Sequence, residues 1–186
     1  MNWLKKILKA GEKIKTAIRE RATKEDIKNS KWMSPCCGSN PVLKSSIFND
    51  ENLNTCPNCS KHFPFPPRSR FDHFYGKNNW EEIETPWILD DPLSWPNGVY
   101  KKKLALARKS TNQRCSVLVA LGEKDGIKIT SFAINSAFIG GAINVESADA
   151  ILKSCDVALE NKTPLVAWSE GGGQSMFESG LSLQGM

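Results

Sequence analysis

Four of the six cysteines lie close together in the sequence, at Cys36, Cys37, Cys56 and Cys59. A module of this size buries too little apolar surface to fold without support, so bound metal or disulfides must stabilise it. No secretion signal is recognisable in residues 1–31, which favours metal-binding thiolates over disulfides. We therefore expect residues 32–64 to form a small zinc-ribbon module with a structural ion.

The ligand spacing is regular on one side of this module and irregular on the other. Cys56-Pro57-Asn58-Cys59 places two thiolates on one tight turn, where both reach a tetrahedral ion. Cys36 and Cys37 are adjacent, and the side chains of neighbours normally diverge. Cys37 is the natural third ligand, and the fourth is either Cys36 or His62. The alternative is a zinc-free module with unused thiols.

Positive charge is concentrated in the first 31 residues, which hold ten Lys or Arg against four acids. Apolar residues at helical spacing predict one amphipathic helix over residues 3–18, followed by a charged linker to residue 31. This helix is expected to dock on its own protein or on a partner subunit, with an anionic membrane or nucleic acid as the alternative. No segment is long and apolar enough to span a membrane, so no membrane span is expected.

The remaining chain predicts an irregular connector and then the start of an α/β domain. Residues 65–99 are rich in proline, which argues against long regular elements. Later patterns predict a hairpin, a helix and a third strand that is apolar throughout and therefore expected to be buried. The predicted ranges are a helix over 98–112, strands over 116–121 and 127–134, a helix over 147–160 and a strand over 164–168.

Two glycine clusters follow strands of this predicted domain. Gly171, Gly172 and Gly173 end the third strand and precede a segment that could begin a helix, whereas Gly140 and Gly141 follow the second strand. Without Cβ atoms the backbone can approach a ligand, and its N–H groups, with a helix N-terminus, can stabilise an oxyanion. Tight turns also explain such clusters. Phosphate-loop and dinucleotide motifs are absent, and no Ser/His/Asp set is evident.

The order and spacing of several motifs resemble the β subunit of acetyl-CoA carboxylase carboxyltransferase, a crotonase-type family, over almost the whole chain. The motifs are residues 1–8, Trp32, Cys56–Cys59 with His62, 80–83, 91–93, 100–104, Phe138-Ile139-Gly140-Gly141, Ser169-Glu170-Gly171-Gly172-Gly173, Met176, Glu178 and 182–183.

This resemblance implies an α/β fold, with a small N-terminal zinc ribbon followed by a partial crotonase-like domain of ββα repeats at 100–186, truncated at Met186. It also implies a carboxyltransferase α subunit and a biotin carboxyl carrier protein as partners, with biotin supplied in trans. The reaction would carboxylate acetyl-CoA to malonyl-CoA for fatty-acid synthesis in the cytoplasm, or in the plastid stroma. Gly172 and Gly173 would contact the oxyanion, with Gly140, Gly141 and Gly171 binding substrate.

The chain departs from the family pattern at several positions. Ser34 or Pro35 stands where the first zinc cysteine belongs, Ala150 replaces a lysine and Ser175 replaces an arginine. Loss of the lysine at position 150 and of the arginine at position 175 favours a rival hypothesis, a non-catalytic assembly or regulatory paralogue, whereas retention of Gly171-Gly172-Gly173 favours the enzyme. A zinc-ribbon nucleic-acid binder is a weaker alternative, because basic charge is sparse outside the leader, residues 1–31.

Overall fold

A computed structural model describes residues 32–33, 37–38, 42–49 and 51–184. The predicted leader helix, its linker, Ser34, Pro35 and Cys36 lie outside the described residues. The chain divides into two compact units, Met1–Phe63 and Pro64–Met186, which are treated separately below. Within the part of the chain that the structure describes, no helix has the length and apolar character needed to cross a membrane.

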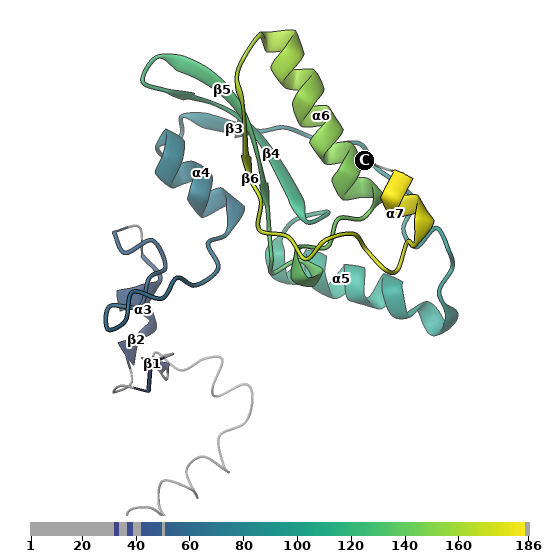
Figure 1. Cartoon of the computed structure of the whole chain (residues 1–186), viewed down its shortest axis with the longest axis horizontal. Helices are drawn as coiled ribbons and strands as arrows, with labels where there is room; N and C mark the ends of the chain where they lie inside the picture. Colours follow the sequence, from purple (N-terminus) through teal and green to yellow (C-terminus); the bar gives the residue numbers. More distant parts are fainter. Residues whose placement is uncertain (1–31, 34–36, 39–41, 50, 185–186) are drawn as a thin grey trace, which may run out of the picture. The chain divides into compact units, whose positions relative to one another are not determined.

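The first unit contains a short ribbon and one helical turn. Strand β1 (Trp32–Met33) pairs antiparallel with β2 (Val42–Leu43), and α3 (Lys44–Ile47) follows at once (Figure 1). Farther along, Thr55 and His62 form an antiparallel bridge. The short ribbon agrees with the sequence prediction, but the helical turn was not foreseen.

The second unit is built on a four-stranded sheet in the order β3-β4-β5-β6. β4 (Val117–Lys124) and β5 (Ile127–Ile134) form an antiparallel hairpin that reverses at Asp125 and Gly126. β6 (Leu165–Trp168) runs parallel to β5, so the connection between them must cross over, and α6 (Val145–Asn161) makes that crossing. β3 (Trp80–Glu82) pairs antiparallel with β4 on the other side.

Helices cover both faces of this sheet (Figure 1). Side chains alternate along β4, so Leu118 and Ala120 pack with Phe71 and Tyr75 of α4 (Pro67–Tyr75). Val117 and Val119 face the opposite side and share a core with Ala150 of α6. This double coverage explains why residues 115–120 are all buried.

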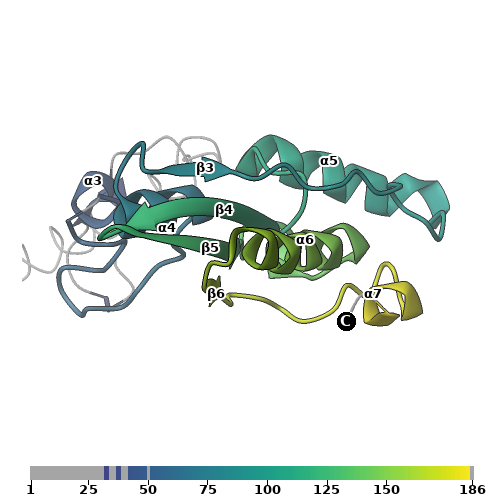
Figure 2. The ribbon, with the colours of Figure 1, turned by 90° about the horizontal axis from the view of Figure 1, so that it is seen from above.

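Helix α5 (Val99–Thr111) crosses the end of the sheet where β4 begins, as Figures 1 and 2 show. Its Tyr100 is buried with Phe138 and stacks on Phe177, the ring centroids lying 4.7 Å apart. The Tyr100 hydroxyl donates to Glu178 Oε1 over 2.7 Å, and Glu178 Oε2 accepts from the N–H of Val145 over 2.7 Å. The segment before α7 (Gly180–Gln184) is thereby tied to α5 and to the first residue of α6.

A second buried carboxylate lies in the first turn of α6. Glu146 is 3% exposed and accepts hydrogen bonds from both Arg108 (3.1 Å) and Arg114 (2.7 Å). Burial raises the pKa of this carboxyl in spite of the two guanidinium groups, so desolvation is the larger effect. Arg108 also pairs with Asp90, and both arginines lie over the ring of Trp87. The loop before α5 is thus fixed to α6.

Two predicted features of the second unit differ in the structure. The proline-rich connector contains α4 and β3, because Pro67 occupies the first turn of a helix, where the missing N–H costs nothing. The third strand was expected to be buried, but Leu165 is 38% exposed. As the last strand of the sheet, β6 turns only Val166 and Trp168 toward the α4 face and leaves the other side open.

Gly122 lies so close to α4 that only glycine fits there. A Cβ at Gly122 would be 2.6 Å from the ring of Tyr75, whose hydroxyl hydrogen-bonds to Ile129 and Ser131 and so resists displacement. We expect Gly122→Ala to lower the free energy of unfolding by about 1–3 kcal/mol, the usual range for overpacking. Urea unfolding of both proteins measures this loss of free energy. Gly180→Ala is the control, because Gly180 has open space, and an equal loss in both variants would contradict the packing argument.

Candidate functional site

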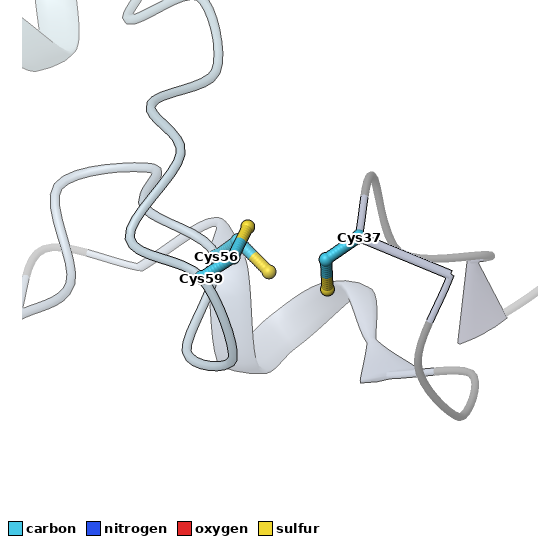
Figure 3. Close-up of side chains that lie close together, drawn as sticks. All are labelled: Cys37, Cys56 and Cys59. Carbon is cyan, nitrogen blue, oxygen red and sulfur yellow. The ribbon is translucent and has the colours of Figure 1, made fainter.

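Three cysteines of the first unit converge on one point (Figure 3). The sulfur atoms of Cys37, Cys56 and Cys59 all lie within 4.8 Å of one another. Cys37 comes from the upstream part of the module and the other two from the downstream turn. Thiolates at such distances can hold a single metal ion, so these three residues could form a metal site.

The downstream turn is shaped by its own backbone. The N–H of Ser60 donates to the carbonyl of Cys56 (2.9 Å), and the N–H of Cys56 donates to the carbonyl of Lys61 (2.8 Å). Ser60 adopts a φ of 58°, a left-handed conformation that reverses the chain directly after Cys59. These bonds hold both cysteines of the pair on the same side of the turn.

The fourth ligand that the sequence predicted is not identified by the structure. Cys36 lies outside the described residues. The ligand atoms of His62 do not converge with the three sulfur atoms, and its Nδ1 lies 3.1 Å from Thr55 Oγ1. Cys115 belongs to the core of the second unit, where burial raises the pKa of its thiol to about 11. That thiol is therefore unsuited to metal binding or nucleophilic chemistry.

The structure brings the two glycine clusters of the second unit together. A Cβ at Gly141 would lie 2.6 Å from the carbonyl oxygen of Glu170, and one at Gly172 would lie 2.7 Å from the carbonyl oxygen of Gly140. Gly171 is also in contact, since its Cβ would be 3.2 Å from the carbonyl oxygen of Gly141. Gly140–Gly141 and Gly171–Gly172 therefore form one backbone contact between the turn after β5 and the turn after β6.

The amides of the second cluster differ in what they bind. The N–H of Gly172 donates to the carbonyl of Gly141 over 3.3 Å, whereas the N–H of Gly173 makes no hydrogen bond among the described residues. Gly173 has a φ of +85° and open space around its Cα, and its carbonyl accepts from Ile143 N over 2.9 Å. The turn is thus held by hydrogen bonds on both sides of the Gly173 amide.

The expected helix dipole does not contribute at this turn. The sequence suggested a helix directly after the glycines, but α7 begins at Gly180 and spans five residues. The next residues instead form a parallel bridge between Gln174 and Ile143. Stabilisation of negative charge here would therefore depend on single amides and not on a helix N-terminus.

Three side chains to which the sequence analysis gave no role meet at Glu170, next to the glycine contact. Glu170 precedes Gly171, and its carboxylate accepts from Ser136 Oγ (2.6 Å) and from Arg70 Nη2 (3.1 Å). Arg70 lies on α4, 100 residues away in the sequence. Only the position of Glu170 beside the glycines could have marked it, since no local pattern links it to Arg70.

Two departures from the family pattern lie in packed positions. Ala150 is 0% exposed in the core beneath α6, and Ser175 is 4% exposed. The N–H of Ser175 donates to Ile143, and its carbonyl accepts from the hydroxyl of Ser182. Neither position presents a charged group to the glycine contact.

Comparisons with known proteins find relatives that match the whole length of this chain. No family model matches the chain. The acetyl-coenzyme A carboxylase carboxyl transferase subunit beta of Pelagibacter ubique (strain HTCC1062) is 46% identical over 187 residues, covering 100% of this chain. Over its whole length, the chain is therefore similar to part of a carboxyl transferase β subunit. The corresponding subunit of Jannaschia sp. (strain CCS1) is 31% identical, again over 100% of the chain.

One solved structure shares the fold of this chain. A transcarboxylase 12S structure matches with a TM-score of 0.53 and 16% sequence identity, covering 66% of this chain and 22% of that one. The mixed α/β arrangement that the sequence predicted is thus a fold that this chain shares with part of the transcarboxylase 12S chain. The chain spans 59% and 56% of the length of the two β-subunit relatives above.

The glycine contact generates a prediction with a matched control. Gly140 and Gly141 share nearly the same φ, +70° and +71°, but only Gly141 has backbone atoms in the place of a Cβ. Gly140→Ala should cost about 1–2 kcal/mol of unfolding free energy, from its left-handed conformation alone. Gly141→Ala should cost roughly 1–3 kcal/mol more. Equal losses in urea unfolding would show that the two glycine clusters do not pack as described.

Proposed function

We propose that the chain acts in the β component of an acetyl-CoA carboxylase carboxyltransferase. The observation that carries the proposal is its 46% identity, over its whole length, to a β subunit of that name. The partners would be the carboxyltransferase α subunit and a biotin carboxyl carrier protein, with acetyl-CoA as acceptor and malonyl-CoA as product. Fatty-acid synthesis in the cytoplasm would be the physiological setting.

The chemistry places a specific demand on the protein. The acetyl α-carbon must lose a proton before it forms a new C–C bond, and the thioester oxygen then carries negative charge. Carboxybiotin on the carrier protein would supply the carboxylate. A backbone N–H aimed at that oxygen stabilises the charge without any ionisable side chain.

The amide of Gly173 suits this role better than that of Gly172. The Gly173 N–H has no competing acceptor among the described residues, whereas Gly172 N–H is engaged by the carbonyl of Gly141. Gly172 would have to exchange that long, 3.3 Å bond for the substrate oxygen. Gly140, Gly141 and Gly171 would support the site by keeping the two turns in contact, with Gly171 also bordering the acyl group.

A valine at position 173 tests the oxyanion role. Gly173→Val strains a backbone with φ +85° and redirects the amide, so carboxyl transfer should fall on the order of 100- to 1000-fold. The measurement is malonyl-CoA formation from carboxybiotin and acetyl-CoA in the complete assembly. Gly126→Val is the control, because Gly126 has a similar φ (+78°) and equally open space in the β4–β5 turn. A wild-type rate for Gly173→Val would refute the role.

The rival hypothesis, a non-catalytic paralogue, draws on Ala150 and Ser175. Both positions are buried and neither carries the charged group that the family pattern has there. Absence of transfer by the complete wild-type assembly, with folding intact, would favour this rival. Transfer at any rate that depends on Gly173 would exclude it.

We further propose that the cysteine cluster binds a structural zinc ion. Sulfur atoms bound to one tetrahedral zinc lie about 3.8 Å apart, given Zn–S bonds of about 2.3 Å. The three sulfur atoms here all lie within 4.8 Å of one another, which supports a shared ion. Cys37, Cys56 and Cys59 would hold the ion, with Cys36 or His62 completing the tetrahedron. Protein ligands at all four positions leave no site for substrate, so the ion would stabilise the module only.

Native mass spectrometry should find one zinc ion per chain. Cys59→Ser should lose the ion, and a chelator should unfold residues 32–64, because the module has little core of its own. Cys155→Ser is the control, since Cys155 lies on α6. Cys36→Ser and His62→Ala distinguish the two candidates for the fourth ligand. A metal-free chain whose first unit stays folded would contradict the assignment.

A further inference from the structure

The turn that leads into the glycines carries an ionisable side chain. Glu170 lies directly before Gly171, and its carbonyl oxygen is the atom that a Cβ on Gly141 would meet at 2.6 Å. Its carboxylate is held from two directions, by the hydroxyl of Ser136 at 2.6 Å and by Arg70 Nη2 at 3.1 Å. Both the backbone and the side chain of Glu170 are therefore fixed at the glycine contact.

The two partners of Glu170 come from different layers. Ser136 belongs to the turn between β5 and Gly140, so its bond joins the two glycine turns a second time. Arg70 belongs to α4 on one face of the sheet, and its guanidinium also contacts the carbonyl of Phe65 (3.3 Å) and lies 5.5 Å from the centroid of that ring. The side chains of Arg70 and Glu170 are 23% and 33% exposed. The pair is thus partly shielded from water, which strengthens its attraction.

A carboxylate in the same turn as the proposed oxyanion site has an electrostatic effect. The Cα atoms of Glu170 and Gly173 lie no more than about 11 Å apart, because three peptide units span at most that distance. Solvent screens charges over about 8 Å at physiological ionic strength and less effectively inside a protein. An uncompensated Glu170 would oppose negative charge on a substrate oxygen, and Arg70 offsets that charge.

We propose that Arg70 is a positioning residue that acts through Glu170. It fixes the turn before Gly171 and neutralises the carboxylate that lies three residues before Gly173 in the sequence. The Nε atom of Arg70 is buried without a hydrogen-bond partner among the described residues, an unfavourable feature that the contacts of Nη2 offset. This inference rests on the proposed carboxyl transfer for its kinetic part and on geometry alone for its structural part.

A double-mutant cycle in the complete assembly separates charge from simple support. Glu170→Gln keeps an oxygen acceptor for Ser136 and removes the charge, so it should lower kcat only a few-fold. Arg70→Gln leaves the carboxylate uncompensated, so kcat should fall on the order of 100-fold, with a smaller change in KM for acetyl-CoA. The double variant should recover to within a few-fold of Glu170→Gln, because the opposing charge is gone. A purely structural role would not give that rescue.

The control is a second ion pair on the same helix. Arg68 of α4 pairs with Glu82 of β3 at 2.9 Å, away from the glycines. Arg68→Gln should leave kcat unchanged. The positioning role would be overturned by a double variant as slow as Arg70→Gln, or by Arg70→Gln at the wild-type rate.

Amide exchange keeps this inference separate from the proposed function. In Arg70→Gln, the Gly172 N–H should exchange faster than in Arg68→Gln, because the contact with Gly141 loosens. If the wild-type assembly transfers no carboxylate, the proposed function fails, and exchange at Gly172 alone decides the structural part. Unchanged exchange in Arg70→Gln would then overturn it.

Discussion

Close backbone contact between two turns organises the second unit of this protein. The carbonyls of Gly140 and Glu170 occupy the places where Cβ atoms on Gly172 and Gly141 would lie. This contact sets how far the turn after β6 can lie from the turn after β5, and it leaves the Gly173 amide between two hydrogen-bonded segments. The sheet leads into both turns, the crossover helix connects them along the chain, and the ion pair from α4 holds the second turn.

The parts of the fold that the sequence predicted are those determined by local pattern. The predicted strand over 127–134 matches β5, and α6 extends one or two residues beyond the predicted helix at each end. Burial of β6 could not be read from its apolar run, since composition does not say whether a second layer covers a strand. α4 was missed because Pro67 was taken as a breaker, whereas it is the first residue of the helix.

The site residues likewise divide into those that local sequence patterns mark and those that only tertiary contacts bring together. Cysteine spacing marked Cys37, Cys56 and Cys59, whose sulfur atoms the structure brings together. The glycine clusters were visible in the sequence, but their mutual contact is tertiary and leaves no pattern of its own. The pair of Arg70 and Glu170 spans 100 residues, and nothing about either residue alone indicates its partner.

The bond from Glu178 to the start of α6 has a consequence for the order of folding. Asn144 caps α6 locally, accepting from the N–H of Ser147, and this bond needs only residues already adjacent in the chain. Val145 N–H is satisfied by a carboxylate 33 positions later. During synthesis, α6 can therefore form and cross over the sheet before its first amide is paired. Once Glu178 has been synthesised, its carboxylate pairs with the first amide of α6 and accepts from the Tyr100 hydroxyl. Contacts between residues far apart in the sequence thus complete a helix that a local cap starts.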